Sequence, residues 1–347
     1  MDDVVEEIVT RLDVEDVVRC KSVCKSWYNL ISSNYFVKAH LNRSYINNNR
    51  EHGYLRIRIH WHFNVFSNGI LPDCIMAGSC NGLVCISPKP GELLVTNPST
   101  REVRKLPMLP YKIGINVWGF GYDSLTDDYK VVVGFNEFKH HMRFQVFSLK
   151  SNKWKFVGDC DYLTYNTYNT KHRICGFLYD GALHRFMDDT KNKKTIILSF
   201  DLSLEKFKEI PLPNDTKYVC DDYRGNRLGM FEERLCILRY NDIYAKSCKK
   251  WVMNNYNSWQ LLPDDYKGNK YGAATPAYLL YFFKDNTWRL VDDRKENKHW
   301  SYQSWSNVGN PIFVKSLVSP YPCEKPKKKT KNNKRKRRKN KACSYER

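Results

Sequence analysis

The chain has 347 residues, with 57 Lys and Arg against 37 Asp and Glu, so its formal net charge is +20. Hydrophobic residues make up 42% of it, enough for a sizeable core, and no apolar run approaches the roughly 18 residues of a membrane-spanning helix. These properties, together with the acidic start at Asp2 and Asp3, argue against a membrane protein or a secretory signal. They predict a soluble, non-secreted protein without a membrane partner.

The twelve cysteines are scattered along the chain, which predicts reduced thiols rather than a disulfide framework. The closest pairs are Cys20 with Cys24 and Cys80 with Cys85. No second pair of cysteines or histidines follows either of them at zinc-finger spacing. We therefore expect no structural metal site and no cofactor.

Apolar residues at the N-terminus recur at intervals of three and four, which predicts two amphipathic helices. The first run is Val4, Val5, Ile8, Val9 and Leu12, and the second is Val17, Cys20, Cys24, Trp27 and Ile31. Asp13 is placed to cap the second helix, and Ser32 or Ser33 to cap a third, short helix over Tyr35–Leu41. Because about 40 residues is the lower size limit for independent folding, part of this apolar surface must face the following domain or another protein.

The stretch "VVEEIVTRLDVEDVVRCKSVCKSWYNLISSNYFVKAHL", residues 4–41, resembles an F-box, and Val23–Trp27 with Leu30 and Ile31 is its most specific part. The F-box is the helical motif that binds the Skp-type adaptor of cullin-RING ubiquitin ligases, so the resemblance implies that partner. Seven residues would then form the adaptor-facing and core apolar surface: Val5, Ile8, Leu12, Val17, Val18, Val23 and Trp27.

The F-box-like stretch departs from the family pattern at two positions. Met1 stands directly before Asp2 where the family usually opens with Leu-Pro, and Asp13 replaces the usual proline after the first helix. Loss of the opening Leu-Pro would remove apolar contact from the docking edge, worth roughly 1.5 to 3 kcal/mol for each fully buried side chain.

The segment "YLRIRIHWHF", Tyr54–Phe63, alternates apolar and polar residues and predicts a half-buried strand. His60 and His62 share its polar face, where a metal could bind, but a solvated face explains them without any ligand. We assign this strand to a linking region, residues 43–76, between the helical unit of residues 1–42 and the rest of the chain.

From residue 77 onward a repeating pattern of strand, Asn or Asp turn, Trp or another apolar residue, and often Leu-Pro or Ile-Pro appears. Its copies contain Val103, Trp154, Phe207 and Trp259, which are separated by 51, 53 and 52 residues, and a weaker fifth copy ends near Trp300. A period near 50 with several strands in each unit is typical of kelch-like β-propeller blades. The expected fold is mainly β, a kelch-like propeller over residues 77–320, with a two-sheet arrangement as the alternative.

The motifs "GSCNGLVCI", "NPSTREVRKLP", "GFGYDSLTDDYKVV", "SFDLSLEKFKEIPLP" and "KKWVMNNYNSW" follow one another between residues 77 and 259. In this order they resemble the F-box-associated domain of plant F-box proteins. With the helical unit, the resemblance implies a protein that holds the adaptor through its helices and a target protein through its β domain.

No segment favours catalysis. "GFGYDS", Gly119–Ser124, lacks a third glycine and a following helix, so close packing of strands explains its glycines better than nucleotide binding. Adjacent acids recur, and we interpret them as turn residues rather than acid–base pairs. They are Asp127–Asp128, Asp188–Asp189, Asp221–Asp222, Asp264–Asp265 and Asp292–Asp293. We predict a non-catalytic protein with no catalytic residue.

The C-terminal tail, residues 321–347, is predicted to be disordered because Glu324–Arg347 holds thirteen Lys or Arg and two Glu. A nuclear-import signal is the favoured interpretation, and nucleic-acid or anionic-membrane contact and a merely solvated tail are the alternatives. The candidate import residues are Lys327, Lys328, Lys329, Lys334, Arg335, Lys336, Arg337, Arg338 and Lys339.

Taken with these resemblances, the sequence predicts a substrate-recognition subunit of an SCF-type E3 ubiquitin ligase, located in the nucleus and cytoplasm. The loop Tyr162–Thr170 is a candidate for target recognition, or else a variable surface loop. The alternative function is a nuclear nucleic-acid-binding protein that uses its basic tail.

Overall fold

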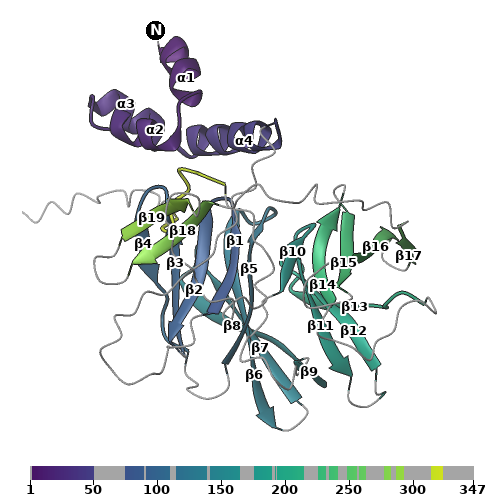
Figure 1. Ribbon diagram of the computed structural model, residues 1–347. Helices are drawn as coiled ribbons and strands as arrows, with labels where there is room; N and C mark the ends of the chain where they lie inside the picture. Colours follow the sequence, from purple (N-terminus) through teal and green to yellow (C-terminus); the bar gives the residue numbers. More distant parts are fainter. Residues whose placement is uncertain are drawn as a thin grey trace, which may run out of the picture.

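The protein consists of a helical head, residues 2–50, and a body of β-sheets (Figure 1), seen here in a computed structural model. The structure describes residues 2–50, 75–89, 91–109, 115–138, 141–164, 176–189, 192, 194–214, 226–231, 234–240, 248–255, 258–262, 277–282, 287–292 and 314–322. The four helices lie together at one end of the body. Residues 314–322, which we call the strap, lie between head and body.

The head contains four helices rather than the three expected. The second expected helix is interrupted because Cys24 has an extended backbone and its Sγ accepts a hydrogen bond from the Trp27 amide at 3.5 Å, which makes it the N-cap of a new helix. The last helix continues to Arg50, well past Leu41, since no glycine or proline interrupts residues 34–50. The helices are α1 (Asp2–Thr10), α2 (Val14–Cys20), α3 (Lys25–Ile31) and α4 (Asn34–Arg50).

The two caps predicted from the sequence lie where the sequence places them. Asp13 is the N-cap residue of α2, although its side chain makes no capping hydrogen bond and only its carbonyl accepts from the helix. Ser33 Oγ accepts a hydrogen bond from the Phe36 amide at 3.1 Å at the start of α4.

The described strands of the body form four antiparallel sheets of four or five strands and one two-stranded sheet. Each sheet is built from consecutive strands, β1 to β4, β5 to β8, β9 to β13, β14 to β17, and β18 with β19. This is the blade-by-blade arrangement of a propeller, and it confirms the expected mainly β fold over the two-sheet alternative.

The strands are β1 (Ile75–Cys80), β2 (Leu83–Lys89), β3 (Glu92–Asn97), β4 (Glu102–Lys105), β5 (Ile115–Asp123), β6 (Asp128–Phe138), β7 (His141–Ser148), β8 (Lys153–Cys160), β9 (Tyr162–Thr164), β10 (Phe177–Tyr179), β11 (Ala182–Asp189), β12 (Lys194–Asp201), β13 (Lys206–Ile210), β14 (Asn226–Phe231), β15 (Arg234–Tyr240), β16 (Cys248–Asn255), β17 (Ser258–Leu261), β18 (Ala277–Phe282) and β19 (Thr287–Asp292).

The repeat seen in the sequence has a structural cause. Its four marker residues each occupy the second position of the last strand of a sheet: Val103 in β4, Trp154 in β8, Phe207 in β13 and Trp259 in β17. The two tryptophans donate hydrogen bonds from Nε1 to the carbonyl of a proline that follows the last strand of the preceding sheet, Trp154 to Pro107 at 3.0 Å and Trp259 to Pro211 at 2.8 Å. The spacing of about 50 residues is therefore the spacing of contacts between successive sheets.

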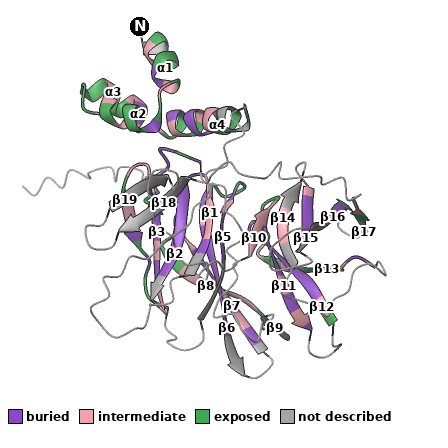
Figure 2. Cartoon of the chain, in the orientation of Figure 1, coloured by how far each residue is buried: buried purple, intermediate pink, exposed green. Residues whose placement is uncertain are grey.

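Apolar residues are buried mainly between neighbouring sheets (Figure 2). Separate clusters join the first sheet to the second, the second to the third, and the third to the fourth. Gly119 and Gly121 of β5 allow this close approach, because a Cβ at either position would lie within 2.7 Å of Leu183 in β11 or of Leu202 in the turn after β12. This confirms close packing as the reason for the glycines of "GFGYDS".

Only some of the adjacent acidic residues lie in turns, where the sequence analysis placed all of them. Asp127 lies in a turn with φ of 53°, and Asp128 begins β6. Asp188 and Asp189 instead end β11, where Asp189 accepts a hydrogen bond from the Asn192 amide at 3.1 Å. Asp292 ends β19, while residues 221–222, 264–265 and 293 lie outside the described part.

Several other predictions fall on residues that the structure does not describe. They are the strand Tyr54–Phe63 with His60 and His62, the copy near Trp300, and the import residues of the tail. The expected loop Tyr162–Thr170 is corrected at its start, because Tyr162–Thr164 forms β9 and pairs with the end of β11.

Candidate functional site

The head has a small core of its own, formed where its four helices meet. Its buried members come from every helix, and the strap adds Leu317, which is only 3% exposed. The helices of the head therefore complete their core with a residue from near the other end of the chain. The core residues are Val9, Val14, Val17, Ile31, Phe36 and Leu317.

The strap is fixed to the first sheet by buried polar contacts. The Asn97 side chain donates from Nδ2 to the carbonyls of Ser316 at 2.9 Å and Val318 at 2.7 Å. Arg104 donates from Nη1 to the Pro320 carbonyl at 2.8 Å and to the Leu149 carbonyl at 3.0 Å. Since the same strap carries Leu317, it connects the head core to the body.

Polar contacts at the margin of the head add to this connection. Lys315 of the strap pairs with Glu15 of α2 at 2.7 Å, and Lys38 of α4 pairs with Asp127 of the body at 2.9 Å. Partial burial, the largest single influence, would raise the pKa of Glu15. The hydrogen bond from Lys315, a backbone hydrogen bond and the charges of Lys315 and Arg19 together outweigh it and lower that pKa below its usual value. These two ion pairs and the strap connect the head to the body.

A second part of the apolar surface of the head is left uncovered. Val4 and Ile8 lie one turn apart on α1 and are 63% and 56% exposed, and Val23, in the turn between α2 and α3, is 62% exposed. Tyr28 of α3 and Tyr35 of α4 are also exposed. Figure 2 shows this exposure on α1 and α3, away from the side of the head that faces the body.

The seven predicted adaptor residues divide into three groups. Ile8 and Val23 are exposed, and Val17 is fully buried in the head core. The remaining four, Val5, Leu12, Val18 and Trp27, are partly buried against that core. The sequence analysis did not identify Val4 or Tyr28 as surface residues. The i, i+4 spacing of Val4 and Ile8 indicates that these two residues share one face of α1, and this could have identified Val4.

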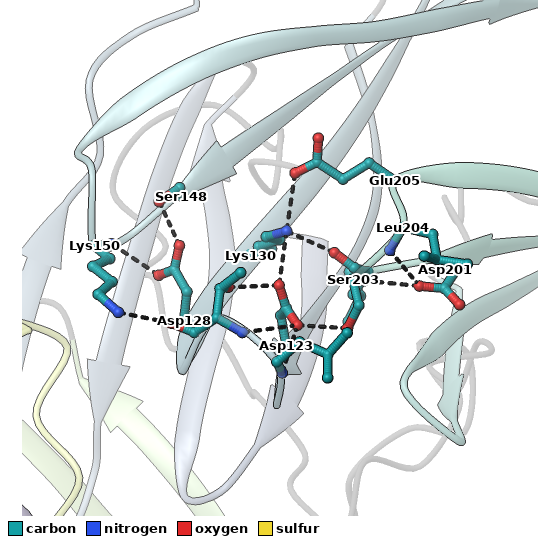
Figure 3. Close-up of polar contacts among 12 residues, drawn as sticks. Asp123, Asp128, Lys130, Ser148, Lys150, Asp201, Ser203, Leu204 and Glu205 are labelled. Carbon is teal, nitrogen blue, oxygen red and sulfur yellow. Dashed lines mark hydrogen bonds and ion pairs between the residues drawn. The ribbon is translucent and has the colours of Figure 1, made fainter.

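A buried ionic network joins the second and third sheets (Figure 3). Lys130 Nζ lies 3.0 Å from Asp123 Oδ2 and 2.9 Å from Glu205 Oε1, and it donates to the Leu202 carbonyl at 2.6 Å. Burial would raise the pKa of Asp123, but hydrogen bonds from Ser203, Thr126 and Lys130 lower it strongly. Because its charges are paired with one another, we assign the network to holding the sheets together.

Among the described residues, no group of three His, Cys, Asp or Glu side chains is placed to bind a metal ion. None of the described helices combines the length and the apolar character needed to cross a bilayer.

An F-box-like head with an exposed apolar surface, connected to a body of successive antiparallel sheets, defines a two-part interaction protein. Comparison with known families agrees: residues 39–262 match the F-box associated beta propeller domain, and residues 2–39 match the F-box domain. The chain belongs to the plant F-box proteins that carry an F-box associated β-propeller domain. Proteins of this kind are in general non-catalytic substrate receptors.

Individual relatives cover most of the chain. F-box protein CPR1 of Arabidopsis thaliana is 30% identical over 367 residues, which covers 93% of this chain and 86% of the relative. F-box protein At4g22390 of the same plant is 25% identical and covers 74% and 71%. The solved haemagglutinin-neuraminidase of parainfluenza virus 5 aligns with 61% of this chain and 66% of its own at 9% identity and a TM-score of 0.31, too weak a likeness to support an argument.

Proposed function

We propose that this protein is the substrate-recognition subunit of an SCF-type E3 ubiquitin ligase. Its head binds a Skp-type adaptor, which links it to a cullin, and its body binds the protein to be ubiquitinated. The observation that supports this proposal best is the exposure of Val4, Ile8 and Val23 on a head whose other apolar side is covered by its own body. An apolar surface of this kind is typical of a protein–protein contact.

The contribution of this chain to ubiquitin transfer is positional. Binding energy comes from burying the exposed side chains, at roughly 1.5 to 3 kcal/mol for each large aliphatic residue that becomes fully buried. The strap and the ion pairs of the head connect the two binding regions. Tethering then raises the effective concentration of a target lysine near the conjugating enzyme, with no covalent step on this chain.

The departure at Asp13 is compatible with adaptor binding. Asp13 has φ of −64° and ψ of 154°, which are the angles that a proline at this position would adopt. The backbone between α1 and α2 therefore keeps the shape that the usual proline of the family would give it.

The test is binding of a purified Skp-type adaptor to the full chain by titration calorimetry. The double variant Ile8→Ser, Val23→Ser should lose roughly 100-fold in affinity, because two apolar side chains no longer become buried. The matched control is Leu125→Ser, Leu204→Ser, which changes two side chains of the body that are 78% and 65% exposed. Equal affinities for both double variants would contradict the proposal. Trp27 is unsuitable for this test because it packs against the head core.

We further propose that the basic tail is a nuclear-import signal, which gives the protein both nuclear and cytoplasmic populations. The supporting observation is the density of Lys and Arg between residues 325 and 341. A fluorescent fusion lacking residues 325–347 should be excluded from nuclei. Under the alternative, in which the tail binds nucleic acid, the deletion would instead abolish salt-dependent binding to DNA or RNA.

A further inference from the structure

The strap carries a serine hydroxyl at the point where it meets β4. Ser319 Oγ donates to Glu102 Oε1 at 3.2 Å and accepts from the Tyr321 amide at 3.2 Å. Figure 1 shows the strap, in yellow, passing between the helices and the first sheet. Ser319 follows Leu317, the strap residue of the head core, by two positions. A chemical change at Ser319 therefore acts on the segment that joins the head to the body.

The partner of Ser319 makes this position sensitive to negative charge. Thr100 Oγ1 donates to Glu102 Oε2 at 3.0 Å, so hydroxyl groups hold the Glu102 carboxylate at both of its oxygens. Arg104 and Lys105, the basic residues of β4, are engaged with other partners. A negative group on Ser319 would face the carboxylate at hydrogen-bond distance, and like charges placed so close repel each other.

Ser319 also lies in a sequence that suits a class of protein kinases. The chain has two Ser-Pro pairs, Ser87–Pro88 and Ser319–Pro320, and Ser-Pro is the pair that proline-directed serine kinases modify. Ser87 is 4% exposed inside β2, whereas Ser319 is partly exposed in a segment that is neither helix nor strand. A residue before proline favours the extended backbone in which a substrate segment enters a kinase. These differences favour Ser319 over Ser87.

From this geometry we propose that Ser319 is a phosphorylation site for a proline-directed serine kinase and that the phosphate releases the strap from β4. The γ-phosphoryl group of ATP passes to Ser319 Oγ as its bond to the β-phosphate oxygen breaks. ADP leaves, and the hydroxyl proton goes to the catalytic base of the kinase. Phosphoserine carries about −1.5 to −2 charges at pH 7 and would lie against Glu102. Because Pro320 is buried, the kinase acts on chains in which the end of the strap has lifted, and the phosphate prevents its return.

Release of the strap removes contacts from both regions at once. Leu317 leaves the head core, and the buried Asn97 side chain loses the carbonyls of Ser316 and Val318. The exposed apolar residues of the head are not touched by this change. Phosphorylation therefore regulates the connection between head and body, and it does so whether or not an adaptor is bound.

The first test is phosphorylation of the full, folded chain by a purified proline-directed serine kinase with ATP. Mass spectrometry should locate the phosphate on Ser319, and Ser319→Ala should lower the total incorporation about tenfold. Ser87→Ala is the matched control, because it removes the other Ser-Pro serine, and it should leave the incorporation unchanged. Absence of phosphate from Ser319, or equal labelling of Ser87, would overturn the assignment.

Hydrogen–deuterium exchange then tests the release of the strap. Phosphorylation, or Ser319→Asp, should speed exchange about tenfold or more in residues 314–322 and in α1 to α3. Ser319→Ala removes the hydroxyl without adding charge and should change exchange less than about threefold. Ser151→Asp, which adds the same charge in an exposed turn, is the matched control and should change neither segment.

Glu102→Gln gives the decisive comparison, because it removes the charge that repels the phosphate. Exchange in the phosphorylated Glu102→Gln chain should stay within about threefold of the unphosphorylated chain. Equal effects of Ser319→Ala and Ser319→Asp, or no rescue by Glu102→Gln, would overturn the proposal. Slower exchange after phosphorylation would overturn it as well, since it would mean that the phosphate binds a cation such as Arg104 and tightens the strap.

Discussion

The head and the body differ in how they cover their apolar residues. In the body, apolar clusters join the first four sheets in succession, and the most exposed leucines of the body, Leu125 and Leu204, stand singly in turns. In the head, one apolar side is covered by Leu317 of the strap, while Val4, Ile8 and Val23 remain exposed. The difference indicates that the described sheets of the body cover one another, whereas the head keeps an exposed apolar surface for a partner.

The largest expected effect is destabilisation of the body by Lys130→Met. This change leaves Asp123 and Glu205 near each other without their shared cation, which should cost about 4 kcal/mol in the free energy of unfolding. Denaturant unfolding monitored by tryptophan fluorescence measures the loss. Lys155→Met is the matched control, because Lys155 also pairs with Glu205 but is 70% exposed, and its loss should cost less than about 1 kcal/mol. Similar costs for the two variants would show that burial of Lys130 is unimportant.

Leu317→Ala should affect the head selectively. Removing most of a buried leucine costs about 3 kcal/mol, and this residue belongs to the head core. Hydrogen exchange should therefore speed up in α1 to α3, while the third and fourth sheets keep their protection. Leu204→Ala, at a leucine that is 65% exposed, is the control and should change neither region. Uniform loss of protection in both regions would contradict separate cores.

Acid should destabilise both regions, the body more strongly. Burial lowers the pKa of His184 in β11 to about 4 and also lowers that of His40 in α4. The unfolded chain therefore takes up protons first, so the contribution of these histidines to the free energy of unfolding is present above about pH 6.5 and is lost as the pH drops toward 4. For His184 the loss is about 2 kcal/mol between pH 7.5 and pH 5.

His184→Gln should remove most of this pH dependence, because glutamine does not titrate and can still hydrogen-bond to Ser199. Stability measured at pH 7.5 and pH 5 in both proteins gives the comparison. His40→Gln should remove a smaller part of the pH dependence than His184→Gln. A larger effect of His40→Gln would contradict the account.

The smallest expected effect is a gain in stability. Asp13→Pro matches the backbone angles already present at that position, so it should stabilise the head by about 0.5 to 1 kcal/mol through the unfolded state. Thermal unfolding of the two proteins measures the gain. A loss of stability would mean that the backbone between α1 and α2 differs from that of a proline-containing relative.

Repeating features were predictable from the sequence because each copy carries the same local contacts. Trp154 and Trp259 stand in equivalent strands and donate to equivalent proline carbonyls, so their spacing indicated the succession of sheets. The helices of the head were predictable from periodicity, but their interruption at Cys24 was not, since cysteine is not among the common N-cap residues.

The strap and a cleft of the body could not be predicted in the same way. Asn97 and Ser316 are separated by 219 positions, and no local pattern indicates that a side chain of the first sheet holds the strap. The strap also affects which of the predicted adaptor residues are exposed, because its Leu317 completes the core in which Val17 is buried. A cleft between the second and third sheets is lined by residues of β8, β9, β11, β12 and β13, whose proximity follows from packing between sheets.

The central claim is that the head, and not the body, presents the adaptor-binding surface. Hydrogen–deuterium exchange of the full chain with and without a purified Skp-type adaptor tests it most directly. We predict new protection in α1 and in peptides that contain Val23 and Tyr28, with no change in the second and third sheets. Protection confined to the sheets, or no protection anywhere at saturating adaptor, would contradict the account.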